Sequence, residues 1–266
     1  MTTVVITGST KGIGLGLTAE FLKAGCRVII SGRNINLLKR EQEKFHHQYG
    51  AERIADVPCD VTDFSQVQEL WDRAVETFQT VDIWINNAGV VNPSTAFHAL
   101  DNGTIRSVVE TNVIGTMFGS KVALEGMTAQ GHGAIYNFEG FGSSGSVMYG
   151  LSVYGTTKRG VRYFTRSLIE EQKDSPVIIG SLSPGMVVTD LLLKDIDVMD
   201  EEQKERFLKI VNILGDTVET VTPFLVRKML ENKRHGAEIE WLTKAKAARR
   251  FLSAPFRRRD LLTDIG

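Results

Sequence analysis

The chain has 266 residues, 42% of them hydrophobic and 24% charged, which is the composition of an ordinary folded protein and excludes general disorder. Its 31 Lys and Arg residues are balanced by 32 Asp and Glu residues, so the net charge of -1 argues against nucleic acid as a partner. The two cysteines have no disulfide-framework or metal-ligand spacing and the five histidines show no ligand pattern, so we predict no metal site.

The start of the chain has no secretion signal, because Met1 is followed almost at once by the apolar run from Val4 to Ile6, without a basic segment or a cleavage site. No apolar stretch reaches the roughly 18 residues that a membrane-spanning helix needs. We therefore expect a cytoplasmic protein.

Short apolar runs rich in β-branched residues alternate with amphipathic helical segments along the chain. The predicted strands are Thr3–Thr7, Arg27–Ser31, Arg53–Pro58, Asp82–Asn86, Ala134–Phe138, Val177–Ser183 and Ile239–Leu242. Most are hydrophobic on successive residues, which is typical of parallel strands buried on both faces by helices. This order of elements predicts an α/β fold with a doubly wound, seven-stranded parallel sheet, in one Rossmann-type three-layer domain over residues 1–266.

A glycine-rich turn follows the first predicted strand and opens the helix that carries Leu17 and Phe21. Glycines let the backbone turn tightly and approach a pyrophosphate, whose charge is stabilised by the free N–H groups of a helix N-terminus. The residues expected to contact a dinucleotide here are Gly8, Ser9, Thr10, Lys11, Gly12, Ile13 and Gly14.

The end of the second predicted strand indicates which dinucleotide is bound. Folds that bind NAD place an acidic residue there, against the ribose 2′-hydroxyl. This chain has Ser31-Gly32-Arg33 instead, and Arg33 together with Lys11 would attract a 2′-phosphate. We therefore predict NADPH as the cofactor, with NADP preferred over NAD.

Two later segments stand apart from the alternating pattern. Residues 190–216, inserted after the sixth predicted strand, are predicted to form a helical substrate lid. Its apolar residues, among them Leu191 and Phe207, either cover a bulky hydrophobic carbonyl substrate or seal the core or a subunit contact. The basic tail, residues 243–266, either packs its aromatic side chains on the body of the protein or lies on an anionic membrane surface.

Four motifs occur in the order and spacing of the short-chain dehydrogenase/reductase family: the turn from Thr7 to Gly14, Asn86-Asn87-Ala88-Gly89, Tyr154-x-x-x-Lys158 and Ser183-Pro184-Gly185. The chain resembles this family over essentially its whole length. The resemblance implies hydride transfer between a nicotinamide and a carbonyl or alcohol, by a homodimer or homotetramer. It also implies support of the catalytic lysine by Asn112, and cofactor contacts from Asp60, Val61, Asn87, Ala88, Gly89, Pro184, Gly185, Val187 and Thr189.

Tyr154 and Lys158 are expected to share one face of a helix, because they are four residues apart. A carbonyl that receives a hydride also needs a proton, and a free tyrosine with a pKa of about 10 is a weak acid–base group at neutral pH. A nearby ammonium stabilises the phenolate, so we expect Lys158 to lower the pKa of Tyr154. Tyr154 is thus the predicted proton donor, and Lys158 its electrostatic partner and a ribose ligand.

One position departs from the family pattern. The family places a serine at the end of the fifth strand to bind the substrate carbonyl, and here that position is Gly140. Either Ser143, in the loop that follows, or a buried and protonated Glu139 could supply the missing hydrogen bond.

Within the family, the segments from Asn137 to Ser143, from Ser183 to Leu192 and from Glu240 to Lys244 resemble chlorophyll b reductases. This resemblance implies NADPH reduction of the 7-formyl group of chlorophyll b or chlorophyllide b to a hydroxymethyl group. Two alternatives remain. One is a short-chain carbonyl reductase or alcohol dehydrogenase with another substrate, and the other is an NADP-binding sensor without catalysis, which the missing serine would explain.

Overall fold

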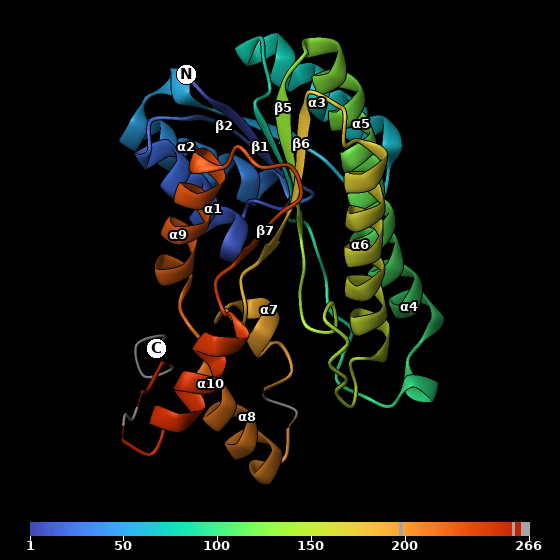
Figure 1. Ribbon diagram of the computed structural model, residues 1–266, viewed down its shortest axis with the longest axis vertical. Coiled ribbons are helices and arrows are strands. Elements are labelled where there is room, and N and C mark those ends of the chain that lie inside the picture. The colour runs from blue at the N-terminus through green and yellow to red at the C-terminus, as the bar shows by residue number, and fades with distance from the viewer. Residues whose placement is uncertain (197–198, 257–258, 262–266) are drawn as a thin grey trace.

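The structure is a computed structural model that describes residues 1–196, 199–256 and 259–261. Within these ranges, seven parallel strands form one sheet in the order β3-β2-β1-β4-β5-β6-β7 (Figure 1). The strands are β1 (Thr3–Ile6), β2 (Arg27–Gly32), β3 (Ile54–Pro58), β4 (Ile83–Asn86), β5 (Gly133–Phe138), β6 (Val177–Ser183) and β7 (Ala237–Glu240). The doubly wound α/β fold expected from the sequence is confirmed.

Helices cover both faces of this sheet. One face carries α1 (Gly12–Lys23), α2 (Ile35–Tyr49) and α9 (Val218–Glu231), and the other carries α3 (Phe64–Phe78), α5 (Gly115–Gln130) and α6 (Ser152–Glu171) (Figure 1). The shorter elements are η1 (Ala51–Arg53), η2 (Phe97–Ala99), α4 (Asn102–Val109), the π-helical turn η3 (Glu110–Ile114), α7 (Asp190–Leu193), α8 (Glu201–Leu214) and α10 (Lys244–Ser253). None of the described helices is long and apolar enough to cross a membrane.

Each face of the sheet has its own apolar core. Val4 and Ile6 of β1 belong to the core under α1, together with Leu17 and Phe21, whereas Val5 belongs to the core on the opposite face. Successive residues of a strand point to opposite faces, so a strand buried on both sides needs an unbroken apolar run. Burial of each such side chain stabilises the fold by about 1.5–3 kcal/mol.

The last strand begins two residues earlier than predicted. The sequence predicts a strand over 239–242, but β7 spans Ala237–Glu240. It pairs only with β6 and buries only Ile239, so this edge strand lacks the apolar run by which the inner strands are found. Trp241 leaves the sheet, and its ring packs edge-on against Phe224 with 5.2 Å between the ring centroids.

The carboxyl ends of the strands meet at the lower edge of the sheet in Figure 1. The direction of winding reverses between β1 and β4, and such a switch point opens a crevice in which α/β folds bind ligands. The helices α7, α8 and α10 lie beyond this same edge (Figure 1). The loops that carry the predicted site residues therefore gather around one crevice.

Candidate active site

The turn between β1 and α1 has the shape of a phosphate cradle. Gly8 and Gly12 have φ angles of 63° and 50°, which residues with a side chain rarely adopt. A Cβ atom on Gly8 would lie 2.8 Å from the Cα of Ala88, and one on Gly14 would lie 2.5 Å from the carbonyl oxygen of Gly8. No side chain caps the first turn of α1, so its N–H groups are open to an anion and the turn fits a dinucleotide pyrophosphate.

Thr7 joins this turn to the loop after β4. Its hydroxyl accepts hydrogen bonds from the backbone N–H groups of Asn87 and Ala88, at 3.0 and 3.1 Å. The side-chain amide of Asn87 donates in return to the carbonyl oxygens of Thr7 and Gly8, both at 2.9 Å. The structure thus brings the segment from Asn87 to Gly89 next to the glycine turn. This role of Thr7 could not be predicted from the sequence, because the motif gives no sign of where its hydroxyl points.

Ser9 lies in the turn but its side chain points into the protein. Its hydroxyl donates to the carbonyl oxygen of Ile6 at 2.9 Å and accepts from the N–H of Ser31 at 2.8 Å, and the residue is fully buried. The backbone N–H of Ser9 also donates to the carbonyl oxygen of Ser31 at 2.9 Å, so Ser9 holds β1 to β2 and neither its hydroxyl nor its N–H is free for a cofactor.

Two cations lie on the rim of the crevice. The side chain of Thr10 packs against Gly32, which brings the loops of Lys11 and Arg33 together. Arg33 Nη1 is 3.8 Å from a carboxylate oxygen of Asp60, and Lys11 Nζ is 3.6 Å from one of Asp190. Exposed pairs at such distances contribute little free energy, so both cations are free to meet a phosphate.

The other predicted cofactor residues also lie along the crevice. Val61 is buried, and its Cγ2 would be 2.6 Å from a Cβ on Gly115, so the loop after β3 packs directly on α5. Thr189 lies across the glycine turn, with its Cγ2 3.3 Å from the place of a Cβ on Gly12. The loop from Pro184 to Thr189 therefore closes the crevice from the other side.

Tyr154 and Lys158 lie one turn apart on α6, near the end of β5. The ammonium of Lys158 donates to the carbonyl oxygen of Phe138 at 3.2 Å and lies 5.9 Å from the centroid of the Tyr154 ring. Burial lowers the pKa of Lys158 to about 8, against the opposite effect of the Glu139 charge. Burial also raises the pKa of Tyr154 to about 12, which is opposite to the direction expected from the sequence. Loss of hydration outweighs the field of the ammonium at this distance.

Gly140 lies directly against the reactive hydroxyl. A Cβ on this residue would be 2.5 Å from the phenol oxygen of Tyr154 and 3.2 Å from Cγ of Lys158. A serine therefore does not fit here while Tyr154 keeps its position. At the position where the family has a serine, the phenol of Tyr154 packs directly on the backbone of Gly140.

The two expected replacements for the serine, Glu139 and Ser143, are both buried near the end of β5. The carboxylate of Glu139 accepts from Nη1 of Arg162 at 2.8 Å, while the same guanidinium pairs with Glu238 on β7. Ser143 is buried in the turn after β5, and its N–H donates to the carbonyl oxygen of Gly140 at 3.1 Å. Its role in catalysis stays a prediction.

Asn112 forms hydrogen bonds with residues next to the catalytic pair, among them Thr157, the neighbour of Lys158. It lies in the π-helical turn η3, fully buried, and its side chain bonds to the backbone N–H and carbonyl of Val90 at 2.8 and 2.9 Å. The same amide donates to the hydroxyl of Thr157 at 3.0 Å. A π-helical turn inside a long helix often marks a functional site. Asn112 thus holds the loop after β4 against α6 and so fixes the surroundings of Lys158.

Asn92 was not predicted as a site residue. Its side chain is fully buried, accepts from the N–H of Tyr154 at 3.1 Å and donates to the carbonyl oxygen of Gly150 at 2.7 Å. It therefore positions the start of α6 and the end of the loop after β5. A single asparagine in a loop carries no sequence signal for such a role.

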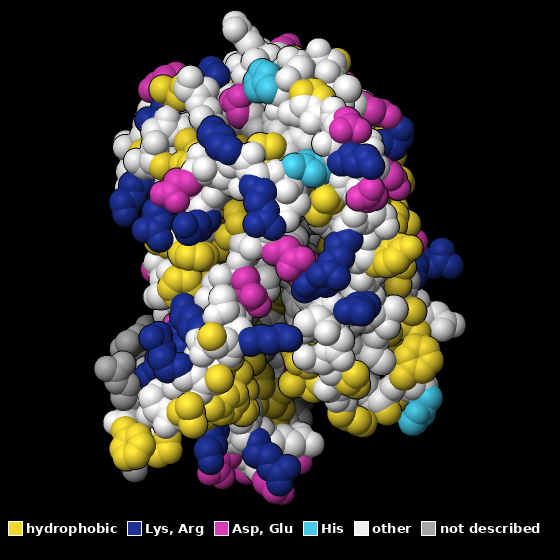
Figure 2. Space-filling view, in the orientation of Figure 1, with side chains coloured by type: hydrophobic (Ala, Val, Ile, Leu, Met, Phe, Trp, Pro, Cys, Tyr) yellow, Lys and Arg dark blue, Asp and Glu magenta, His cyan; other side chains and the backbone are white. Residues whose placement is uncertain are grey.

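The predicted lid contains α7 and α8. Its first part reaches the loop after β4, where Asp195 accepts from the N–H of Ser94 at 2.7 Å and Lys194 donates to the carbonyl oxygen of Val91 at 3.3 Å. A hollow lies between α7 and the loop after β5, with hydrophobic side chains in its walls (Figure 2). Because it lies at the edge of the sheet where the carboxyl ends of the strands meet, we take it as the candidate substrate cleft.

The second part of the lid packs against the tail, and its role over the substrate stays a prediction. Helix α8 packs against α10, and a cavity of about 1300 Å³ lies between them, lined on the α8 side by Ile213 and on the α10 side by Phe251. Helix α10 of the tail thus packs against α8, but its large apolar side chains do not pack on the body of the protein, since Phe251, Leu252 and Phe256 are 47%, 79% and 88% exposed. Contact of the tail with a membrane surface stays a prediction, and residues 257–258 and 262–266 lie outside the described residues. Within the described chain, no group of His, Cys, Asp and Glu side chains is placed to hold a metal ion.

Residues 2–205 match the family model of the short chain dehydrogenases. The chain belongs to the short-chain dehydrogenase family. It is 36% identical over 230 residues to chlorophyll(ide) b reductase NOL of Arabidopsis thaliana, and the aligned region covers 84% of this chain and 64% of the plant protein. It is 32% identical over 256 residues to the probable chlorophyll(ide) b reductase NYC1 of the same plant, with 90% and 50% covered. The chain thus spans about half to two thirds of the length of these relatives.

Among solved structures, ElxO with NADP bound superposes with a TM-score of 0.79 at 29% identity, over 93% of this chain and 99% of that chain. The short-chain dehydrogenases are oxidoreductases that bind NAD(P), so the enzyme class expected from the motifs is confirmed.

Proposed function

We propose that this oxidoreductase uses NADPH to reduce the 7-formyl group of chlorophyll b or chlorophyllide b to a hydroxymethyl group. The observation that carries the proposal is a protonated tyrosine, Tyr154, in a site whose entrance is lined by exposed apolar side chains. Tyr154, with a pKa of about 12, is protonated at physiological pH and can give its proton to a carbonyl oxygen.

The mouth of the cleft supports a large apolar substrate. The side chains of the loop after β5 stand out into solvent, with Val147 94% and Tyr149 74% exposed, and Leu191 on α7 is 43% exposed. Folded proteins rarely leave such a group of apolar side chains in water unless it binds something. A chlorin ring with its ester groups has the size and polarity to cover it.

The cofactor half of the crevice supports NADPH. The glycine turn and the segment from Asn87 to Gly89 would hold the dinucleotide, and Arg33 with Lys11 would meet its 2′-phosphate. NADP is also the ligand in the similar structure of ElxO. When bound, NADPH supplies the hydride.

The residues of this chain supply the proton and the charge. Tyr154 donates its proton to the carbonyl oxygen of the substrate and is left as a phenolate. Lys158, protonated below a pH of about 8, stabilises that phenolate. The carbonyl oxygen of Phe138 holds the ammonium at the end of β5, and Glu139 adds a favourable negative charge nearby.

The test is a spectroscopic assay of NADPH with chlorophyllide b in detergent. We expect loss of the formyl chromophore together with oxidation of NADPH, both abolished in Tyr154→Phe. Reduction of other bulky aldehydes but not of chlorophyllide b would reject the substrate and keep the reductase.

The absence of a serine at position 140 favours one competitor, a protein that binds NADP without catalysis. Tight NADPH binding without turnover of any carbonyl in a panel of aldehydes and ketones would support that competitor. Turnover that Lys158→Met removes would exclude it.

A further inference from the structure

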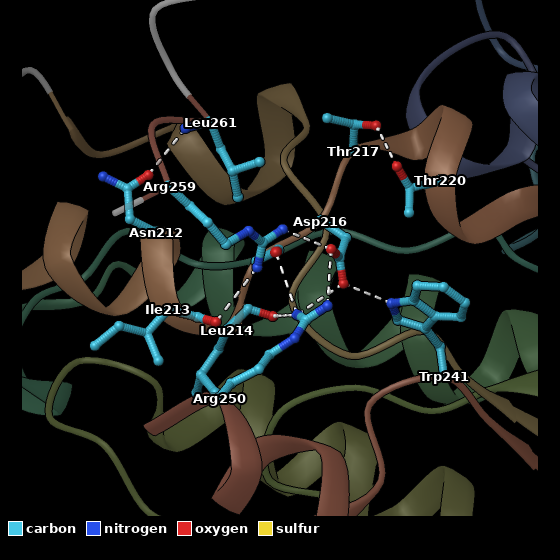
Figure 3. A network of polar contacts seen from close by, with 11 residues as sticks. Asn212, Ile213, Leu214, Asp216, Thr217, Thr220, Trp241, Arg250, Arg259 and Leu261 are labelled. Atoms are coloured by element: carbon cyan, nitrogen blue, oxygen red, sulfur yellow. Dashed lines mark hydrogen bonds and ion pairs between the residues drawn. The ribbon is translucent and has the colours of Figure 1, made fainter. Parts of the chain in front are cut away.

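The lid ends at a buried carboxylate, that of Asp216, which is bound by the side chains of Trp241, Arg250 and Arg259. Asp216 lies between α8 and α9, and its side chain is 3% exposed. Arg250 binds it through both Nη atoms, at 2.8 and 3.0 Å, and Nη2 of Arg259 binds it at 2.8 Å (Figure 3). The indole N–H of Trp241 donates to it at 2.6 Å. Although burial raises the pKa of Asp216, these hydrogen bonds bring it below its usual value.

The backbone of the same residue is bound to the nicotinamide-side loop. The N–H of Asp216 donates to the carbonyl oxygen of Met186 at 3.0 Å, and its carbonyl accepts from the N–H of Val188 at 2.9 Å. These two bonds form a parallel bridge just after Pro184 and Gly185. A movement of Asp216 therefore moves the loop that closes the crevice beside Tyr154.

The two arginines also close the C-terminal end of α8. Nη1 of Arg250 donates to the carbonyl oxygen of Leu214 at 2.9 Å, and Nη1 of Arg259 donates to that of Ile213 at 3.4 Å. The last carbonyls of a helix have no partner inside the helix, and cations there are favourable. The C-terminal segment thus fixes both α8 and the hinge of the lid.

We propose that Arg250 and Arg259 are positioning residues of the reaction, which act through Asp216 to hold the nicotinamide-side loop and the end of α8 in place. The family match ends at residue 205, so these residues are outside the part of the chain that carries the family pattern. The proposal makes the tail a component of the active site. It rests on the proposed reductase activity for its kinetic test only.

The first experiment compares Arg250→Met with Arg249→Met. Met keeps most of the aliphatic length of Arg without its charge, and Arg249 is an exposed residue of the same helix. We expect Arg250→Met to lower kcat/KM for chlorophyllide b about 10- to 100-fold, because small displacements of a closing loop are costly to catalysis. NADPH affinity should change less than kcat/KM, because the hydrogen bonds that join the glycine turn to the loop after β4 do not involve Asp216. Arg249→Met should match the wild type.

The second measurement needs no turnover. Hydrogen–deuterium exchange over residues 184–216 should be faster in Arg250→Met than in the wild type or Arg249→Met, both with and without NADPH. Failure of the wild type to reduce chlorophyllide b would reject the proposed substrate but leave this readout intact. Equal exchange and equal kcat/KM in Arg250→Met and Arg249→Met would overturn the positioning role.

A double-mutant cycle separates action through Asp216 from a general loss of packing. If Arg250 acts through Asp216, the effects of Arg250→Met and Asp216→Asn on kcat/KM are strongly non-additive, because a single variant leaves one buried group without its partner. Additive effects would contradict the proposal. Should Arg250→Met fail to fold, Arg259→Met replaces it in the cycle, since the Arg259 side chain is 32% exposed and more peripheral.

Discussion

The two halves of the candidate site are built in different ways. In the cofactor half, the turn from Gly8 to Gly14 and the loop after β4 contact each other through backbone atoms and two short side chains. In the substrate half, Gly140 and Asn92 position Tyr154. Asp216 holds the end of the lid through arginines up to 43 residues away in the chain. The first half depends on local backbone geometry, and the second on long-range contacts between single side chains.

This difference decides what a sequence can reveal. Glycine spacing after an apolar strand reports a backbone shape, so the fold, the turn and the Tyr154–Lys158 pair could be predicted. The pKa of Tyr154 could not, because it depends on how deeply the phenol is buried. The Asp216 network leaves no motif, since an acid, a tryptophan and two arginines far apart in the chain look like ordinary surface residues.

The largest expected effect tests the substrate half directly. Tyr154→Phe removes the proton donor and keeps the ring, so kcat should fall about 10²- to 10⁴-fold in steady-state assays with chlorophyllide b. NADPH binding, followed by fluorescence titration, should persist because the glycine turn is unchanged. Retained activity would mean that another group donates the proton.

Gly140→Ser restores the residue that the family carries, and yet we expect it to reduce kcat/KM about 10- to 100-fold. The new Cβ would lie 2.5 Å from the phenol oxygen and displace it. Gly160→Ser is the matched control on α6, where a Cβ meets nothing within 4 Å. Full activity of Gly140→Ser would show that Tyr154 can move without loss of function. The substrate half would then not depend on the contact between Gly140 and Tyr154.

The pH dependence of kcat should reflect the buried ammonium. Lys158 has a pKa of about 8, so the rate should fall as the pH rises above 8 and the charge is lost. A kcat that stays constant up to pH 10 would contradict this prediction. The Tyr154→Phe variant is the control, because it measures the activity that does not depend on the proton donor.

The same residue gives a stability prediction of opposite sign. Because the pKa of Lys158 is below its usual 10.5, the folded state binds fewer protons than the unfolded state between about pH 8 and 10.5, and stability rises with pH across that window. Lys158→Met should remove this slope and stabilise the protein at pH 7 by about 1–3 kcal/mol. Urea unfolding at pH 7 and pH 10 measures both effects.

The smallest effect belongs to the cofactor half. Arg33→Ala should raise the KM for NADPH about 10-fold and leave that for NADH nearly unchanged, because an exposed guanidinium contributes through the 2′-phosphate alone. Arg27→Ala, at the start of β2, is the control. Equal changes for both cofactors would mean that Arg33 shapes the loop and does not select the phosphate.

The Asp216 network has a consequence for the order in which this protein becomes competent during synthesis. Arg250 and Arg259 leave the ribosome after all seven described strands, so the cofactor crevice can form on a nascent chain whose lid is still loose. A product that ends before residue 250 would lack both arginines that bind Asp216, and with them the contacts that hold the loop from Pro184 to Thr189.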